Sequence, residues 1–184
     1  MNNRSCTVQV SGISPYSPAK GLDPEADYKQ KKGENPNDFE QRVWREKAHF
    51  DGDKLVIPAT SVQIGLYMAA KSLNLKFGKK AAAGFVESGT IAMGDHSIVG
   101  GDGKPIMKDS LVSTRLFLPS DGKALHKGGK GTRVWRIFPI IHEWKAVFTV
   151  ELLHEELQRK EVMEPLFEQF GRFVGIGRFR PERG

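Results

Sequence analysis

The sequence predicts a single α+β domain in which the elements follow the order strand, helix, strands, helix, strand. Its 184 residues suit one domain, and a hydrophobic content of 39% is enough to build a buried core. Polarity alternates with a period of two along residues 5–11, whereas apolar residues recur at helical spacing along residues 62–73. The first pattern is typical of a strand and the second of a helix.

The first strand, at residues 5–11, places Cys6, Val8 and Val10 on one face and ends in a turn-rich exit at residues 12–18. Residues 19–39 are polar, and we interpret them as an inserted excursion. Further strands are predicted at residues 55–58, 85–93, 111–118, 134–138 and 144–152, with a short helix or strand at residues 44–50.

Two helices are predicted, at residues 60–73 and 155–170. Thr60 or Ser61 is expected to cap the first helix, and Pro165 is expected to kink or break the second. Residues 172–179 then form a final strand or a glycine-rich loop. This order is compatible with the ferredoxin-like β-α-β-β-α-β arrangement with inserted loops.

The composition favours a polyanionic partner in a reducing compartment. The formal net charge is +6 and the pI is about 9.4. The single cysteine, Cys6, allows no intramolecular disulfide and no cysteine-based zinc site, which fits the cytoplasm. No run approaches the roughly 18–20 apolar residues of a membrane span, and the first residues do not resemble a secretory signal, so no membrane partner is expected.

A basic hairpin loop at residues 121–133 is the first candidate for binding nucleic acid. It carries Lys123, Lys127, Lys130 and Arg133 among four glycines. Lysine and arginine neutralise phosphates, and glycines let the backbone approach a ligand closely. The alternative is a solvated hairpin tip whose charges only aid solubility.

The second candidate is the segment at residues 170–181, where glycines alternate with arginines and phenylalanines. Its candidate nucleic-acid-binding residues are Arg172, Gly175, Gly177, Arg178 and Arg180. Arginine can bridge phosphates, and phenylalanine offers a surface on which bases stack. The alternative is an edge strand whose phenylalanines, Phe173 among them, belong to the core.

Three smaller features are ambiguous. Lys79 and Lys80 follow the first helix, where cations either contact phosphates or complement the helix dipole. Trp135 lies between two arginines and is either a core or rim aromatic or a stacking surface. The five histidines have no metal-binding spacing, so no metal ion or cofactor is expected, although His126 in the basic loop could act as an acid or base on RNA.

Three segments together resemble the RAMP superfamily, the RNA-recognition-motif-like proteins of CRISPR effector complexes. They are residues 8–15 (VQVSGISP), residues 55–66 (LVIPATSVQIGL) and residues 170–180 (FGRFVGIGRFR). The first is similar to the family's first strand and exit loop. The second is similar to its apolar strand, proline and following helix, and the third to its C-terminal glycine-rich loop.

The resemblance, which is nearest to the backbone subunits that coat guide RNA, implies a ferredoxin-like core and a non-catalytic RNA-binding protein. It implies a homo-oligomer or a subunit of a ribonucleoprotein complex, with the basic loop as a projecting hairpin. The positions that match family motifs are Ser61, Gly65, Gly171, Gly175 and Gly177. Two alternatives stay open: a metal-independent RNA-processing ribonuclease, and a phage-borne protein that binds or mimics a subunit of such a complex.

Overall fold

The computed structural model describes residues 4–22, 28–119 and 133–179, and it confirms a mixed α+β architecture. The strands of its main sheet are β1 (Arg4–Ser11), β2 (Phe50–Asp51), β3 (Lys54–Ile57), β6 (Thr90–Ala92), β7 (His96–Val99) and β10 (Lys145–Leu152). Their order is β1-β10-β7-β3-β2, with β6 also beside β10, and all neighbouring pairs are antiparallel. β1 is therefore an edge strand.

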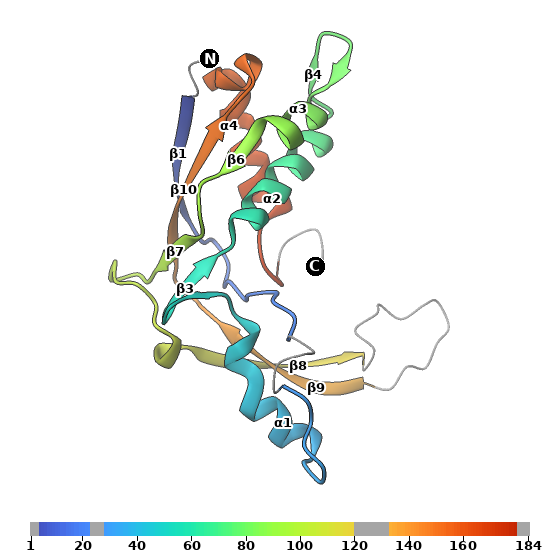
Figure 1. Ribbon diagram of the computed structural model, residues 1–184, viewed down its shortest axis with the longest axis vertical. Helices are drawn as coiled ribbons and strands as arrows, with labels where there is room; N and C mark the ends of the chain where they lie inside the picture. Colours follow the sequence, from blue (N-terminus) through green and yellow to red (C-terminus); the bar gives the residue numbers. More distant parts are fainter. Residues whose placement is uncertain (1–3, 23–27, 120–132, 180–184) are drawn as a thin grey trace.

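Helices α2 (Ala59–Ser72), α3 (Ala82–Gly89) and α4 (Lys160–Gln169) gather on one side of this sheet (Figure 1). The main core lies between them and the strands, around fully buried side chains such as Leu66, Phe148 and Leu166. Within the described residues, no helix combines the length and apolar character needed to cross a membrane.

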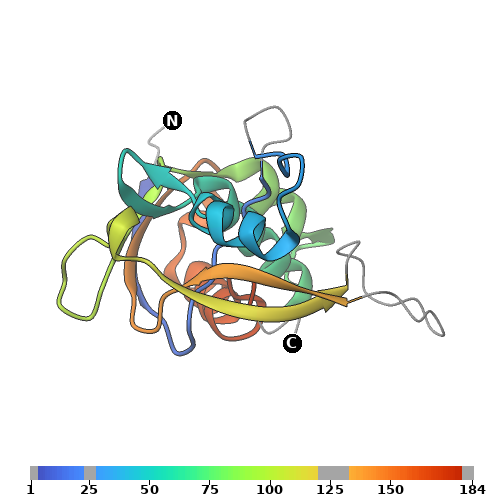
Figure 2. The same cartoon turned by 90° about the horizontal axis from the view of Figure 1, so that it is seen from below.

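Two two-stranded ribbons stand apart from the main sheet. One is the short hairpin of β4 (Lys76–Phe77) and β5 (Lys80–Ala81), and the other consists of β8 (Val112–Pro119) and β9 (Arg133–Ile140). β8 and β9 pair along their whole length, and Figure 2 shows them as a long ribbon running past the body of the molecule. Of the basic loop predicted at residues 121–133, residues 121–132 lie outside the described residues, and Arg133 begins β9.

The predicted strand at residues 85–93 is wrong, because its first half is the end of α3. Ala82, Val86 and Gly89 are buried at helical spacing, and the Ser88 hydroxyl donates to the Gly84 carbonyl one turn earlier. Only Thr90–Ala92 are extended, as β6. The β-branched residues around Gly89 resemble a strand locally, but packing on α2 and the sheet stabilises the helix.

The capping prediction for α2 is also wrong. α2 begins at Ala59, and no side chain of the helix's own segment caps it. Instead the Asp95 carboxylate accepts a hydrogen bond of 3.0 Å from the Ala59 amide. The cap thus comes from a turn distant in sequence, which local pattern reading does not detect.

The predicted helix at residues 155–170 is divided, though not at Pro165. A 3-10 turn (Glu155–Gln158) precedes α4, and the interruption falls at Arg159, whose ψ of 132° is extended. α4 runs through Pro165 and continues into a π-helical turn, Phe170–Val174. Residues 172–174 are therefore helical rather than part of a final strand or loop, and the loop begins at Gly175.

Part of the predicted polar excursion is helical. α1 (Pro36–Val43) follows Asn35, whose side chain accepts a hydrogen bond from the Asp38 amide, and a 3-10 turn (Trp44–Lys47) completes it. An asparagine cap followed by proline is a recognised start signal for a helix. The predicted loop thus extends only to residue 35 among the described residues.

A buried charge cluster attaches α1 and its 3-10 turn to β9. Glu40 accepts hydrogen bonds from Lys47 at 2.5 Å, from Arg136 at 2.8 Å and from the Ile137 amide at 2.7 Å. Burial alone would raise the pKa of Glu40, but these donors outweigh it and hold the pKa below its usual value. Lys47 also donates to the Ile137 carbonyl, so both charges are hydrogen-bonded.

His96 on β7 is buried, and its ring packs edge-on against Phe148 with centroids 5.0 Å apart. Burial lowers the pKa of His96, although the neighbouring Asp95 carboxylate acts in the opposite direction. The folded protein therefore keeps this ring neutral at pH values where the unfolded chain binds a proton.

Acidification from about pH 7.5 to about pH 5.5 is expected to lower the free energy of unfolding, because the unfolded state binds more protons below the ordinary histidine pKa of 6.5. Urea unfolding of the wild type and of His96→Gln measures this. The slope with pH should be smaller in the variant. Equal slopes in wild type and His96→Gln would refute the assignment.

Candidate nucleic-acid interface

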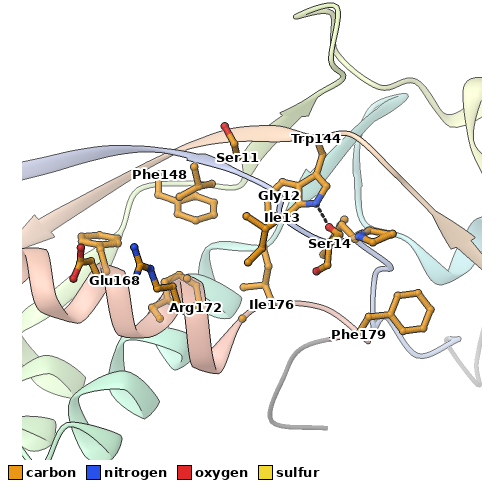
Figure 3. A pocket seen from close by; sticks show the side chains of 17 residues that line it. Ser11, Gly12, Ile13, Ser14, Trp144, Phe148, Glu168, Arg172, Ile176 and Phe179 are labelled. Carbon is orange, nitrogen blue, oxygen red and sulfur yellow. Dashed lines mark hydrogen bonds between the residues drawn. The ribbon is translucent and has the colours of Figure 1, made fainter. Parts of the chain in front are cut away.

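Two adjoining cavities lie where three segments from different parts of the chain meet. The first has a volume of about 260 Å³ and is bounded by the exit of β1, the start of β10 and residues 167–179 (Figure 3). The second, of about 230 Å³, lies between that last segment and α2. Tyr16, Gly175 and Ile176 line both cavities, so the two form one surface.

Aromatic side chains dominate the wall of the first cavity. Phe148 comes from β10, and Trp144 directly precedes that strand (Figure 3). Phe170 and Phe179 flank the glycine-rich turn. The side chain of Ile13 is 89% exposed at the mouth of this cavity. Such walls fit a flat, apolar group with polar edges.

Hydrogen bonds hold the exit of β1 in place. The Trp144 indole donates to the Ser14 carbonyl at 3.0 Å, and Tyr16 exchanges backbone hydrogen bonds of 2.8 and 2.9 Å with Ile141. The Tyr16 ring also lies against Trp144, with centroids 5.6 Å apart. Burial raises the pKa of Tyr16, so this ring stays neutral. These contacts fix the cavity wall on the side of β1.

Close approach requires glycine at three positions around the cavities. A Cβ at Gly12 would lie 2.0 Å from the Trp144 indole, and one at Gly65 would lie 2.1 Å from the Phe170 ring. At Gly177 it would lie 2.6 Å from the Ser17 carbonyl oxygen, and φ there is +79°. Each segment of the sequence resemblance contributes one of these glycines. Together they let the three segments pack directly on one another.

The predicted arginines of the C-terminal segment differ in their surroundings. Arg172 is exposed and lines the first cavity beside Glu168 (Figure 3). Arg178 is half-buried: its guanidinium lies 3.7 Å above the Phe138 ring and donates to the Pro18 carbonyl. Arg172 is thus the described arginine of this segment that lines the cavity, while Arg178 holds the segment in position.

The second cavity contains Ser61 and Gly65 of α2, which pack near Gly175 and Gly177. It also contains His49, which the sequence did not single out. Burial lowers the pKa of His49, and the nearby positive charge of Lys20 lowers it further.

The other predicted residues that the structure describes do not line the cavities. Lys79 and Lys80 lie at the β4–β5 hairpin, at the opposite end of α2 from Ser61 (Figure 1). Arg133 is exposed at the first position of β9. Lys123, His126, Lys127, Lys130 and Arg180 lie outside the described residues.

The β8–β9 ribbon presents a second exposed aromatic surface. The side chains of Phe117 and Trp135 are 47% and 51% exposed, and their rings lie 5.1 Å apart. The Arg115 guanidinium lies 5.7 Å from the Trp135 ring. Trp135 is therefore not a core residue, and Phe173, 61% exposed, is not one either.

Trp144 and Phe148 were not predicted to join this site, because their position depends on pairing between strands far apart in sequence. The register sets Val8 opposite Phe148, and the β1 exit continues past Trp144. The alternation of β10 places Phe148 on the same buried face as Val150. This alternation was the one sequence feature that indicated the side of the sheet on which Phe148 lies.

Over the described ranges, no three His, Cys, Asp or Glu side chains are grouped so that they could hold a metal ion. Comparisons with known proteins add no assignment: no family model, no curated protein and no solved structure matches this chain.

Proposed function

We propose that this protein is a non-catalytic binder of single-stranded RNA of the RAMP type. The observation that carries the proposal is the convergence of residues 12–16, Ser61 with Gly65, and residues 170–177 around the two cavities. Apart from Tyr16, these residues belong to the three segments of the sequence resemblance. A shared binding surface explains why a glycine recurs in each segment and why the third also carries arginines and phenylalanines.

We further propose that the core is ferredoxin-like. β1 lies beside β10, and β10 lies beside β6 and β7. In chain order α2 lies between β1 and β6, with α1, β2 and β3 inserted before it. α4 follows β10. This succession agrees with the first five elements of β-α-β-β-α-β, with the β8–β9 ribbon inserted between β7 and β10.

The chemistry of the cavities favours a single strand over a duplex. Rings such as Trp144 and Phe179 offer stacking surfaces for an unpaired base, and a duplex would keep its bases out of reach. Arg172 on the rim can neutralise a phosphate. The exposed pair Phe117 and Trp135 offers a further stacking surface on the ribbon.

Binding to a fluorescein-labelled oligouridine RNA, followed by fluorescence anisotropy at several KCl concentrations, is expected to weaken steeply with salt. In a plot of log affinity against log salt concentration, each neutralised single-strand phosphate contributes about 0.7 to the downward slope. Arg172→Ala should weaken binding about tenfold and reduce the slope by about 0.7.

Lys104→Ala is the matched control, because it removes one charge from an exposed turn outside the cavities. It should leave the affinity within about twofold of the wild type. Affinity that does not depend on salt, or equal losses in both variants, would contradict the proposed function. RNA cleavage in EDTA would favour the ribonuclease alternative.

A further inference from the structure

The outer edge of β1 offers backbone groups to another strand. Among the described residues, β1 pairs on one side only, with β10, from Arg4 opposite Leu152 to Ser11 opposite Lys145. The next pair in this register is closed by a bond of 2.9 Å from the Gly12 amide to the Trp144 carbonyl. Because such pairs alternate along an antiparallel ladder, the amides and carbonyls of Ser5, Thr7 and Gln9 point away from β10.

A groove of about 960 Å³ lies between this edge and α4. Its floor is apolar and includes the half-buried Cys6, Val8 and Val10 together with Phe167. The groove could therefore accommodate one more strand beside β1. One wall offers backbone hydrogen-bonding groups, and the apolar floor continues the face of the sheet that packs on α4.

The helical wall of the groove is acidic along most of its length. Glu161, Glu164 and Glu168 line it from α4, spaced so that they share one face of the helix. Arg4, Arg159 and Lys160 also line the groove, and Lys160 pairs with Glu164 at 3.2 Å. The three cations and three carboxylates give the lining no net formal charge, so the groove lacks the positive field that favours nucleic acid.

We propose that the groove binds an extended segment of a protein partner, which adds a strand to β1 and directs lysine or arginine side chains toward α4. Backbone hydrogen bonds to the edge of β1 hold the segment, and the apolar stems of its basic side chains cover Cys6, Val10 and Phe167. Their charged ends meet Glu161, Glu164 and Glu168. This inference does not depend on the proposed RNA binding.

The test uses a labelled peptide of eight residues, the length of β1, in which lysine alternates with threonine. Full-length protein should bind it at least about tenfold more tightly than the peptide in which glutamate replaces lysine. Glu161→Lys/Glu164→Lys should weaken the lysine peptide about tenfold, whereas Glu87→Lys, on the exposed side of α3, should leave its affinity within about twofold.

Two further peptides separate strand addition from plain charge attraction. One is N-methylated at every lysine and the other at every threonine, so that charges are kept while one set of backbone donors is lost. Amides of a strand point alternately to its two sides, so only one of these peptides should lose affinity, by about tenfold. Equal affinity of both methylated peptides, or no peptide binding at all, would overturn the proposal. So would self-association that Glu161→Lys/Glu164→Lys abolishes, because the occupant would then be a second copy.

Discussion

Glu40→Ala is expected to lower the free energy of unfolding by about 3–5 kcal/mol. The side chain of Glu40 is 2% exposed and accepts hydrogen bonds from Lys47, Arg136 and the Ile137 amide. Removing it leaves the buried Lys47 ammonium without its counter-charge, and α1 loses its link to β9. Urea unfolding followed by tryptophan fluorescence measures the change.

Glu46→Gln is the matched control for this prediction. Glu46 also accepts two hydrogen bonds, from Lys108 at 2.7 Å and Tyr28 at 3.1 Å, but it is partly exposed. Water replaces such partners, so the loss should stay below about 1 kcal/mol. If Glu40→Ala does not fold, Glu40→Gln gives the comparison. A loss below about 1 kcal/mol for both Glu40 variants would show that the buried cluster contributes little.

Gly177→Ala is expected to weaken both the fold of the C-terminal segment and RNA binding. A left-handed conformation costs a residue with a side chain about 1–3 kcal/mol. The new Cβ would also overlap the Ser17 carbonyl oxygen, which accepts the Arg178 amide at 2.7 Å. That oxygen belongs to the backbone, so the glycine-rich turn must move, and both cavities lose a wall. We expect RNA affinity to fall at least about tenfold.

Gly171→Ala provides the control within the same segment. No atom lies within 4 Å of a Cβ placed there, and Gly171 is not among the residues with positive φ. Its stability should stay within about 0.5 kcal/mol of the wild type, or rise slightly. Its loss of RNA affinity should be smaller than that of Gly177→Ala, because the new methyl group displaces no neighbouring segment. Equal effects of the two substitutions on affinity would show that the position of the glycine-rich turn does not matter for binding.

The two proposed surfaces adjoin along β1 and α4. Phe167 and Glu168 line both the first cavity and the acidic groove, while Arg172 lies one turn beyond Glu168. If both proposals hold, this side of the molecule contacts RNA at one end and a basic protein segment at the other. Such a division of charge would let one small protein hold a partner next to the RNA.

Local sequence patterns were sufficient to predict elements in which the spacing of apolar residues matches the side that is buried. The alternation of Cys6, Val8 and Val10 predicted β1 and its half-buried face, and Leu55–Ile57 predicted β3. Local patterns were insufficient where contacts with distant segments determine the secondary structure or the helix cap. The residues of α3 resemble a strand until they pack on α2, and α2 is capped from Asp95 rather than from its own segment.

The candidate site was predictable in part for the same reason. Glycines and arginines mark residues 170–180 in the sequence, but only pairing of β1 with β10 adds Trp144 and Phe148. Likewise, nothing local distinguishes Arg172 from Arg178. The difference arises because Phe138, from a distant strand, lies under the Arg178 guanidinium.

The central claim is that residues 12–16 and 170–179 form a surface for single-stranded RNA. Photo-crosslinking of a 4-thiouridine RNA to the full-length protein, followed by mass spectrometry of the crosslinked peptides, tests it most directly. We predict crosslinks within both segments that are lost at high salt and strongly reduced in Gly177→Ala. Crosslinks confined to other parts of the chain, or none at low salt, would contradict the account.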